Sequence, residues 1–250
     1  GGDGSGGDPP SNDPCPADLN GSGTVDGGDL GLLLAAWGEP GGGDLDQSGA
    51  VDGADLGLML AAWGGCPVGI EGRVVAYYIE WGTYGRDYQP SDIPYDKITH
   101  LNYAFADIRE DGRIALYDEF AAIDKSFPGD TWDQPYRGLI NQINNVYKPQ
   151  YPHLKTMISV GGWTLSGRFS DVALTVESRS IFAESCVQFI RDYNFDGVDI
   201  DWEYPVEGGL ASNVYRPEDG VNYTLLLQEL RDQLDVAGDE DGVYYELSIA

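Results

Sequence analysis

The chain has 250 residues and carries 42 acidic side chains against 14 basic ones, a formal net charge of −28. Such a charge repels polyanions, so nucleic acid and anionic membrane surfaces are excluded as expected partners. No stretch reaches the ~18 consecutive apolar residues that a membrane helix needs. We therefore predict a protein that acts on a neutral substrate. Because the first residues have the composition of a linker and show no signal-peptide pattern, we expect the natural N-terminus to lie upstream.

The composition divides the chain into four parts. Residues 1–14 are Gly, Asp, Pro, Ser and Asn, which is typical of a linker. Residues 15–66 contain an internal repeat, and residues 67–72 form a second short linker. Residues 73–250 are rich in Tyr, Trp, Ile, Leu and Val and can form a hydrophobic core. The prediction is a small module followed by a larger domain.

The repeat pairs residues 18–38 with residues 44–64, and only five of the 21 aligned positions differ. Each copy has oxygen donors at loop positions 1, 3, 5, 9 and 12, a Gly at position 6 and a backbone carbonyl at position 7, which is a Ca²⁺-binding pattern. An apolar stripe at helical spacing follows each loop. The predicted ligands are Asp18, Asn20, Ser22, Thr24, Asp26 and Asp29, then Asp44, Asp46, Ser48, Ala50, Asp52 and Asp55. This predicts a small all-α, loop-helix module with two Ca²⁺ sites; ordinary Asp-Gly turns are the alternative.

These paired units resemble a dockerin module, a kind of module that binds cohesin domains in cellulosome-like assemblies. The resemblance implies calcium binding and a cohesin-like partner. However, dockerins typically carry polar recognition residues near the helix start and on the exposed helix face. Here those places hold Gly27-Gly28, Gly53-Ala54 and Ala-Ala pairs. A calcium-stiffened spacer or anchoring module is therefore the alternative.

The cysteines add a prediction about the compartment. Cys15 and Cys66 stand just outside the two ends of the repeat, and a disulfide between them would close a loop of about 50 residues. Such a bridge would stabilise the module by roughly 4 kcal/mol and implies an oxidising compartment; two free thiols are the alternative. Cys186 lies on the apolar face of a predicted helix and is expected in the core. We predict a secreted, extracellular protein, with attachment to a cell surface or a complex as an option.

From residue 73 onward, predicted strands and helices alternate. The strands cover residues 74–81, 98–106, 156–163, 197–202 and 244–250, and the helices cover residues 139–147, 178–193 and 223–234. Near-continuous apolar strands in such an alternation indicate a parallel sheet, and candidate chemistry at the strand ends indicates an α/β fold of the (β/α)₈ TIM-barrel type. Only about the first five β/α units fit, because such a barrel needs ~250 residues. We expect residues 1–250 alone to be poorly active.

Three acidic residues alternate along one predicted strand. Asp199, Asp201 and Glu203 therefore point to the same face. Three carboxyl groups inside a barrel are costly unless they share protons or perform chemistry, and their mutual repulsion keeps at least one of them protonated. A protonated carboxyl is what cleavage of a glycosidic bond needs as its general acid. A metal site or a solvated acidic loop is the alternative.

The run Phe-Asp-Gly-Val-Asp-Ile-Asp-Trp-Glu-Tyr-Pro at residues 195–205 resembles the active-site signature of family 18 glycoside hydrolases. Residues 77–86, 100–105 and 159–163 resemble the motifs of the first three strands of that family, in the same order. The resemblance implies a chitinase that cuts β-1,4 bonds between N-acetylglucosamine units. It also implies a retaining, substrate-assisted mechanism that requires no cofactor.

The resemblance also implies roles for individual residues. Glu203 would be the general acid and then the base, Asp201 would orient the acetamido group of the substrate, and Asp199 would share a proton with Asp201. Aromatic side chains would form the sugar platform or its support, with core packing as the alternative: Trp163, Trp81, Tyr77, Phe105, Trp202 and Tyr204. The family also places a Tyr and a Trp on later strands, which this chain does not reach.

Two other functions share parts of this pattern. An endo-β-N-acetylglucosaminidase acting on N-glycans has the same arrangement of acids, and a chitin-binding, lectin-like protein has the same fold without the acid. The presence of Glu203 disfavours the lectin. The extended first-strand motif, together with the three acids, favours chitin over N-glycans.

Overall fold

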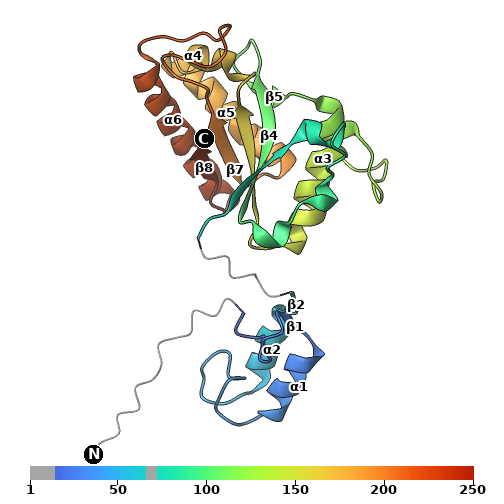
Figure 1. Cartoon of the computed structure of the whole chain (residues 1–250). Coiled ribbons are helices and arrows are strands. Elements are labelled where there is room, and N and C mark those ends of the chain that lie inside the picture. Colours follow the sequence, from blue (N-terminus) through green and yellow to red (C-terminus); the bar gives the residue numbers. More distant parts are fainter. Residues whose placement is uncertain (1–14, 66–71) are drawn as a thin grey trace, which may run out of the picture. The chain divides into compact units, whose positions relative to one another are not determined.

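The computed structural model describes residues 15–65 and 72–250, and the chain divides into two compact units, residues 1–71 and 72–250 (Figure 1). The predicted linker 1–14 and residues 67–71 of the predicted linker 67–72 lie outside the described residues, and so does Cys66. Cys15 takes part in a disulfide bond. Among the described residues, no helix is both long enough and apolar enough to cross a membrane.

The front unit contains the two predicted loop-helix repeats. Helix α1 (Gly27–Ala35) and helix α2 (Gly53–Ala61) each follow a loop, and strands β1 (Thr24–Val25) and β2 (Gly64–Gly65) pair antiparallel. Each helix begins after an aspartate that accepts a hydrogen bond from the second backbone N–H of the helix at 2.7 Å. A small core lies beneath the helices and consists of Cys15, Ala17, Val25, Leu33, Val51 and Met59.

The second unit is built on a parallel sheet. Its strands are β3 (Val75–Ile79), β4 (His100–Ile108), β6 (Lys155–Gly161), β7 (Gly197–Asp201) and β8 (Glu246–Ile249), which lie side by side in chain order. Strand β5 (Ile114–Leu116) pairs antiparallel with β4. Parallel neighbours in sequential order, joined by helical crossovers, are what a (β/α) barrel requires. All five predicted parallel strands are present.

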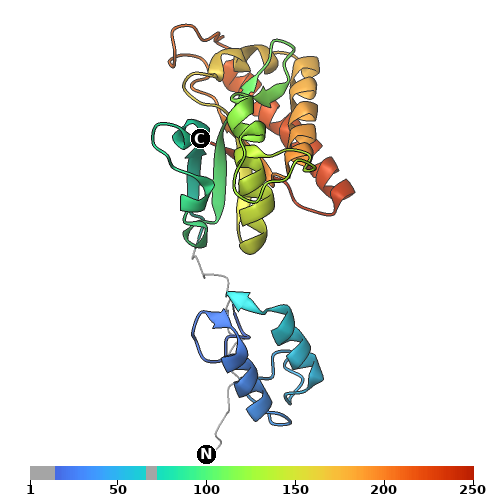
Figure 2. The same cartoon turned by 90° about the vertical axis from the view of Figure 1, so that its right-hand side faces the viewer.

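Helical segments connect these strands. The β4–β6 connection contains η4 (Phe120–Asp124), α3 (Gly138–Asn141), η5 (Gln142–Tyr147) and η6 (Lys148–Gln150). The next two connections contain η7 (Ser166–Arg168), α4 (Phe169–Val172) and α5 (Val176–Tyr193), and then α6 (Asp219–Asp241). Short turns η1 (Glu80–Thr83), η2 (Pro90–Asp92) and η3 (Tyr95–Lys97) follow β3. Figures 1 and 2 show the long helices on one side of the sheet.

Strand periodicity separates the two faces of the sheet. On β7, Val198 and Ile200 are fully buried among the residues of the hydrophobic core. Helix α6 contributes Leu226, Leu230 and Leu234 at a spacing of four residues, so all three lie on one face and all are fully buried. Cys186 of α5 is fully buried and free, as predicted. The acids at alternate positions of β7 therefore face the other side of the sheet.

The element boundaries differ from the predictions in understandable ways. The predicted helix 139–147 begins at Gly138 and opens into a π-helical stretch at Gln142. Helix α6 is longer than predicted at both ends and stops at Gly242, whose φ of 70° is readily adopted by glycine. The first strand ends at Ile79, so Trp81 lies in the turn η1 rather than on the strand. Strand β5 was missed because three residues carry too little periodicity.

A buried carboxyl group lies next to this turn. Glu80 is 1% exposed, and its carboxyl accepts hydrogen bonds from the hydroxyl of Tyr103 at 3.0 Å and from the backbone N–H of Asp118 at 3.2 Å. Burial raises the pKa of Glu80 from its ordinary 4.5 to about 8, and the nearby charge of Asp118 acts in the same direction. Glu80 therefore ties the end of β3 to β4 and to the segment that follows β5.

This raised pKa predicts how the stability depends on pH. As the pH rises from about 4.5 to about 8, the unfolded chain loses the Glu80 proton before the folded chain does, so the free energy of unfolding falls. Glu80→Gln cannot ionise and should be about 2–4 kcal/mol more stable relative to wild type at pH 8.5 than at pH 4.5. Urea unfolding at both pH values measures this, with Glu119→Gln as the exposed control. An equal difference at both pH values would contradict the assignment.

Candidate active site

The three predicted acids lie at and just beyond the carboxyl end of β7. Asp199 and Asp201 are on the strand, at 1% and 9% exposure, and Glu203 follows the strand and is partly exposed. Strand alternation carries all three to the face of the sheet opposite the helices. Burial therefore increases from Glu203 to Asp199, which places Glu203 at the accessible end of the row.

Asp199 is held by hydroxyl groups from three other strands. Its Oδ2 accepts hydrogen bonds from Tyr77 and Ser159, each at 2.8 Å, and its Oδ1 accepts one from Ser248 at 2.6 Å. The register aligns Ser159 and Ser248 directly with Asp199 across β6, β7 and β8. Three donors aimed at one carboxylate fix its orientation.

Asp201 lies between Asp199 and Glu203 in this row. The pKa of Asp201 is raised to about 6, first by burial and then by the charges of Glu203 and Asp199, which act in the same direction. The side chains of Asp201 and Glu203 also interact through a hydrogen bond. Repulsion between the carboxyl groups therefore acts in the predicted direction, with burial as the larger cause.

A cavity of about 400 Å³ opens beside Asp201 and Glu203. It is lined by Tyr77, Ile79, Phe105, Asp201, Glu203, Tyr204 and Ala250. Rings and an aliphatic side chain provide flat apolar surface, and the two carboxyl groups provide polar contacts. Such a lining suits a neutral ligand that has both apolar faces and hydrogen-bonding groups.

Three of the six predicted aromatic residues, Tyr77, Phe105 and Tyr204, line this cavity together with the acids. Trp81 adjoins the cavity through a stacked contact with Phe105, with ring centroids 6.2 Å apart. Trp163 is half-exposed at the end of β6 and is not part of the lining.

The structure corrects the prediction for Trp202. The sequence predicts a substrate contact, but the Trp202 side chain is only 3% exposed. Its ring stacks on that of Phe169, with centroids 5.4 Å apart, and meets the ring of Tyr223 edge-on at 5.2 Å. Asp201 and Glu203, its neighbours in the sequence, face the cavity, so alternation turns Trp202 to the helix side. Core packing is therefore its role.

Two glycines let the strand ends approach closely. A side chain on Gly161 would stand 2.3 Å from the carbonyl oxygen of Asp201, and one on Gly162 would stand 2.8 Å from the ring of Phe105. Both residues also have positive φ, at 105° and 75°. Glycine at both positions therefore keeps the acid-bearing strand and Phe105 against the end of β6.

The front unit places most of its predicted ligands around its two loops. In the second loop, carboxylate oxygens of Asp44, Asp46 and Asp55 lie within 4.8 Å of one another. The Asp44 carboxylate accepts the N–H groups of Ser48 and Gly49 at 2.9 and 2.8 Å, and Ser48 Oγ lies 3.3 Å from the carbonyl of Ala50.

The first loop repeats this geometry. Asp18 accepts the N–H groups of Ser22 and Gly23 at 3.0 and 2.7 Å, and Ser22 Oγ lies 3.0 Å from the carbonyl of Thr24. Asn20 accepts a hydrogen bond from the N–H of Ser22 at 2.8 Å. Each loop therefore gathers carboxylate, hydroxyl and carbonyl oxygens.

Loop positions 9 and 12 have different surroundings. Asp26 and Asp52, at position 9, cap the helices that follow, which differs from the predicted ligand role. Asp29 and Asp55, at position 12, are fully buried, and each accepts backbone hydrogen bonds from its own loop. Residues 15–65 contain eight acidic side chains and no basic one. A hard divalent cation fits this donor set.

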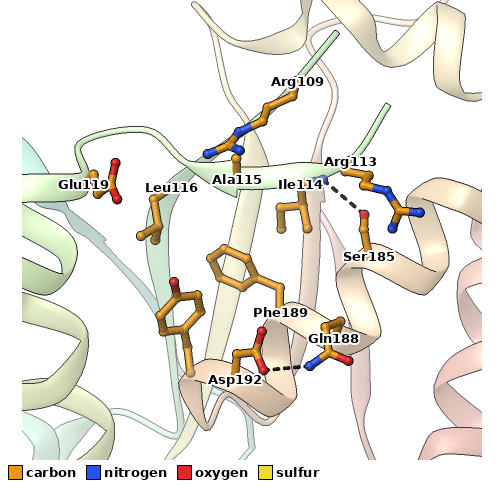
Figure 3. Close-up of a pocket in the computed structure, with 11 residues that line it drawn as sticks. Arg109, Arg113, Ile114, Ala115, Leu116, Glu119, Ser185, Gln188, Phe189 and Asp192 are labelled. Carbon is orange, nitrogen blue, oxygen red and sulfur yellow. Dashed lines mark hydrogen bonds between the residues drawn. The ribbon is translucent and has the colours of Figure 1, made fainter. Parts of the chain in front are cut away.

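A second hollow, of about 300 Å³, lies between β5 and α5 (Figure 3). Its apolar lining residues are Ile114, Ala115, Leu116 and Phe189. Its charged or polar lining residues are Arg109, Arg113, Glu119, Ser185, Gln188, Asp192 and Tyr193. It contains none of the acids or aromatic residues predicted for the site. This hollow therefore carries none of the catalytic chemistry that the sequence indicates.

Comparison with known proteins agrees with this geometry. The model of the glycosyl hydrolases family 18 matches residues 73–250, which include every strand of the sheet and all three acids. The chain belongs to glycosyl hydrolases family 18. Chitinase A1 of Niallia circulans is 50% identical over 208 residues, which cover 71% of this chain and 30% of that protein.

Other family 18 proteins align over the same part of the chain. Endochitinase 1 of Metarhizium robertsii is 39% identical over 178 residues, covering 70% of this chain and 40% of that protein. The structure of chitinase ChiA74 from Bacillus thuringiensis superposes with a TM-score of 0.67 at 42% identity, covering 71% of this chain and 34% of that one. The family 18 chain described here thus spans about a third of the length of these relatives.

Several residues of the site were missed at the level of sequence. One is Ser248, which lies two residues after Glu246 on the last strand and faces the same side of the sheet as the acids. This position on the strand is its only signal in the sequence. Ser159 lies in a recognised motif but was given no role. Ser166 and Asn213 contact the backbone of Glu203 from segments 37 and 10 residues away. Such contacts depend on tertiary structure and leave no periodic pattern.

Proposed function

We propose that this chain belongs to a chitinase that hydrolyses β-1,4 bonds between N-acetylglucosamine units with retention of configuration. The observation that carries the proposal is the row of Asp199, Asp201 and Glu203, which ends in a cavity with aromatic walls. Support comes from relatives that are named chitinases. Chitin or chitooligosaccharides are the proposed substrates.

In this mechanism, Glu203 donates its proton to the leaving glycosidic oxygen as the bond to the anomeric carbon breaks. The carbonyl oxygen of the substrate's own 2-acetamido group attacks that carbon and forms an oxazolinium intermediate. Glu203, now a carboxylate, then takes a proton from the water that opens the intermediate. The partly exposed position of Glu203 at the cavity supports both proton transfers.

Asp201 and Asp199 support the acetamido group in this proposal. Asp201 would accept a hydrogen bond from the acetamido N–H and balance the positive charge of the intermediate. Burial raises the pKa of Asp201, so the shared proton would reside on Asp201 in the resting enzyme. Asp201 would release that proton toward Asp199 when it turns to the substrate.

The alternatives are an endo-β-N-acetylglucosaminidase and a chitin-binding, lectin-like protein. The test is to incubate the full-length gene product with chitohexaose and, separately, with a high-mannose N-glycopeptide. We expect shorter chitooligosaccharides from the first substrate and no released glycan from the second. Release of the glycan with intact chitohexaose would favour the endo-β-N-acetylglucosaminidase, and binding of chitohexaose without products would favour the lectin.

We also propose that the front module binds two Ca²⁺ ions, one in each loop, because both loops gather hard oxygen donors with no basic side chain between residues 15 and 65. The residues that would hold the ions are Asp18, Asn20, Ser22, Thr24 and Asp29, and Asp44, Asp46, Ser48, Ala50 and Asp55. Bound Ca²⁺ would neutralise the clustered carboxylates.

A cohesin-like partner and a secreted location are proposals of the same kind. Support for a protein partner comes from apolar side chains on the two helices and just after their ends that are about half exposed: Leu32, Leu34, Trp37, Leu58, Leu60 and Trp63. Support for an oxidising, extracellular compartment comes from the disulfide at Cys15.

A further inference from the structure

The backbone of Glu203 is held by two side chains. Strand β7 ends at Asp201, so the ladder of the sheet does not reach Glu203. Instead, the N–H of Glu203 donates to Ser166 Oγ at 2.9 Å, and its carbonyl oxygen accepts from Asn213 Nδ2 at 3.0 Å. Both polar backbone groups of the proposed acid are therefore fixed by side chains from other segments.

Ser166 links the ends of two strands. It is fully buried, and its Oγ lies 2.8 Å from the carbonyl oxygen of Gly162 and 3.1 Å from that of Asp201. A serine hydroxyl has one proton to donate and lone pairs to accept. It can therefore accept the Glu203 N–H while donating to one of these carbonyl groups, which sets the path of the chain between Asp201 and Glu203.

Asn213 belongs to the segment between Glu203 and α6, which closes back onto the acid. Gly209 in this segment has a φ of 69°, and a side chain there would stand 2.1 Å from the Glu203 carbonyl oxygen. Further along, Arg216 contacts Ser170 at 2.6 Å and Asp171 at 2.7 Å. The segment is thus anchored on α4, independently of Glu203.

We propose that Ser166 and Asn213 are positioning residues that direct the Glu203 carboxyl group toward the leaving oxygen by fixing its backbone. This inference rests on the proposed function, in which Glu203 is the general acid. Proton donation requires the acid to lie within hydrogen-bonding distance of the leaving oxygen. A displacement of about 1 Å can cost about 10²-fold in rate, so loss of either anchor should weaken this step in particular.

The experiment compares two leaving groups in the full-length gene product. Chitohexaose has a sugar leaving group that needs a proton, whereas 2,4-dinitrophenyl chitobioside has one that departs without it. For both substrates, kcat/KM reports only the steps up to the departure of the leaving group. We expect Ser166→Ala and Asn213→Ala to lower kcat/KM on chitohexaose by about 10- to 100-fold and to leave the value for the dinitrophenyl glycoside close to that of wild type.

Two further variants make the outcome decisive. Ser185→Ala removes a buried hydroxyl of α5 that contacts Ile114 and Phe182 but neither Glu203 nor the Asn213 segment, so it should leave the ratio of the two kcat/KM values unchanged. Glu203→Gln shows how strongly kcat/KM on each substrate depends on the acid itself. Equal losses of kcat/KM on both substrates for that variant would overturn the proposed function. If Glu203→Gln is selective and both anchor variants are not, the positioning role is wrong. If Ser166→Ala shows no cooperative unfolding, and is therefore not properly folded, the result for Asn213→Ala decides whether the positioning role holds, because Asn213 is partly exposed.

Discussion

Replacing Glu203 by Gln should lower kcat on chitohexaose by about 10²- to 10⁴-fold, the usual contribution of a general acid. The amide keeps the size of the side chain but has no acidic proton to give to the leaving oxygen. KM should change little, because the cavity walls formed by Tyr77, Phe105 and Tyr204 are intact. Steady-state kinetics with the full-length gene product measures both constants.

The matched control for this variant is Glu207→Gln. Glu207 is an exposed carboxyl four residues further along the chain and does not line the cavity. Its replacement should leave kcat unchanged. Wild-type kcat in Glu203→Gln would remove Glu203 from the role of acid, and equal losses in the two variants would point to a general effect on folding.

Removal of Ca²⁺ should unfold the front module. Eight acidic side chains without a basic partner repel one another in residues 15–65, and the core beneath the helices is small. With a chelator, circular dichroism should show a loss of helix equivalent to α1 and α2, and added Ca²⁺ should restore it. A spectrum that chelation does not change would contradict the proposal of a metal-coupled fold.

Calorimetric titration distinguishes the roles of two aspartates in the second loop. Wild type should bind two Ca²⁺ ions per chain, and Asp55→Asn should bind one, because the buried Asp55 carboxylate belongs to the oxygen cluster. Asp52→Asn should still bind two, because Asp52 caps helix α2 and asparagine is an equally good cap. Two ions retained in Asp55→Asn would show that the cluster is not the site.

The parallel sheet and the row of acids could be predicted because both depend on local periodicity. Strand runs interrupted by helical runs indicate the topology, and Asp199, Asp201 and Glu203 share a face because strand side chains alternate. The same rule, applied strictly, would have turned Trp202 away from the cavity. That error came from treating every aromatic residue near the acids as part of the platform.

Other parts of the site could not be predicted, because they are contacts between segments that lie far apart in the chain. Tyr77 reaches Asp199 across 122 residues, and Ser248 reaches it across 49. Ser166 and Asn213 are small polar residues in irregular segments, where neither periodicity nor charge indicates their contacts with Glu203. Similarly, the capping role of Asp26 follows from the start of a helix one residue later, which a list of loop positions does not specify.

In the proposed mechanism, hydrolysis is assisted by the substrate and retains the configuration, and Glu203 first donates and then accepts a proton. The chitohexaose digestion tests it most directly when the products are followed by ¹H NMR before they mutarotate. Attack by the acetamido oxygen and then by water inverts the anomeric carbon twice, so the newly formed reducing ends should appear first as the β-anomer. First appearance of the α-anomer would mean a single direct displacement by water and would contradict the mechanism.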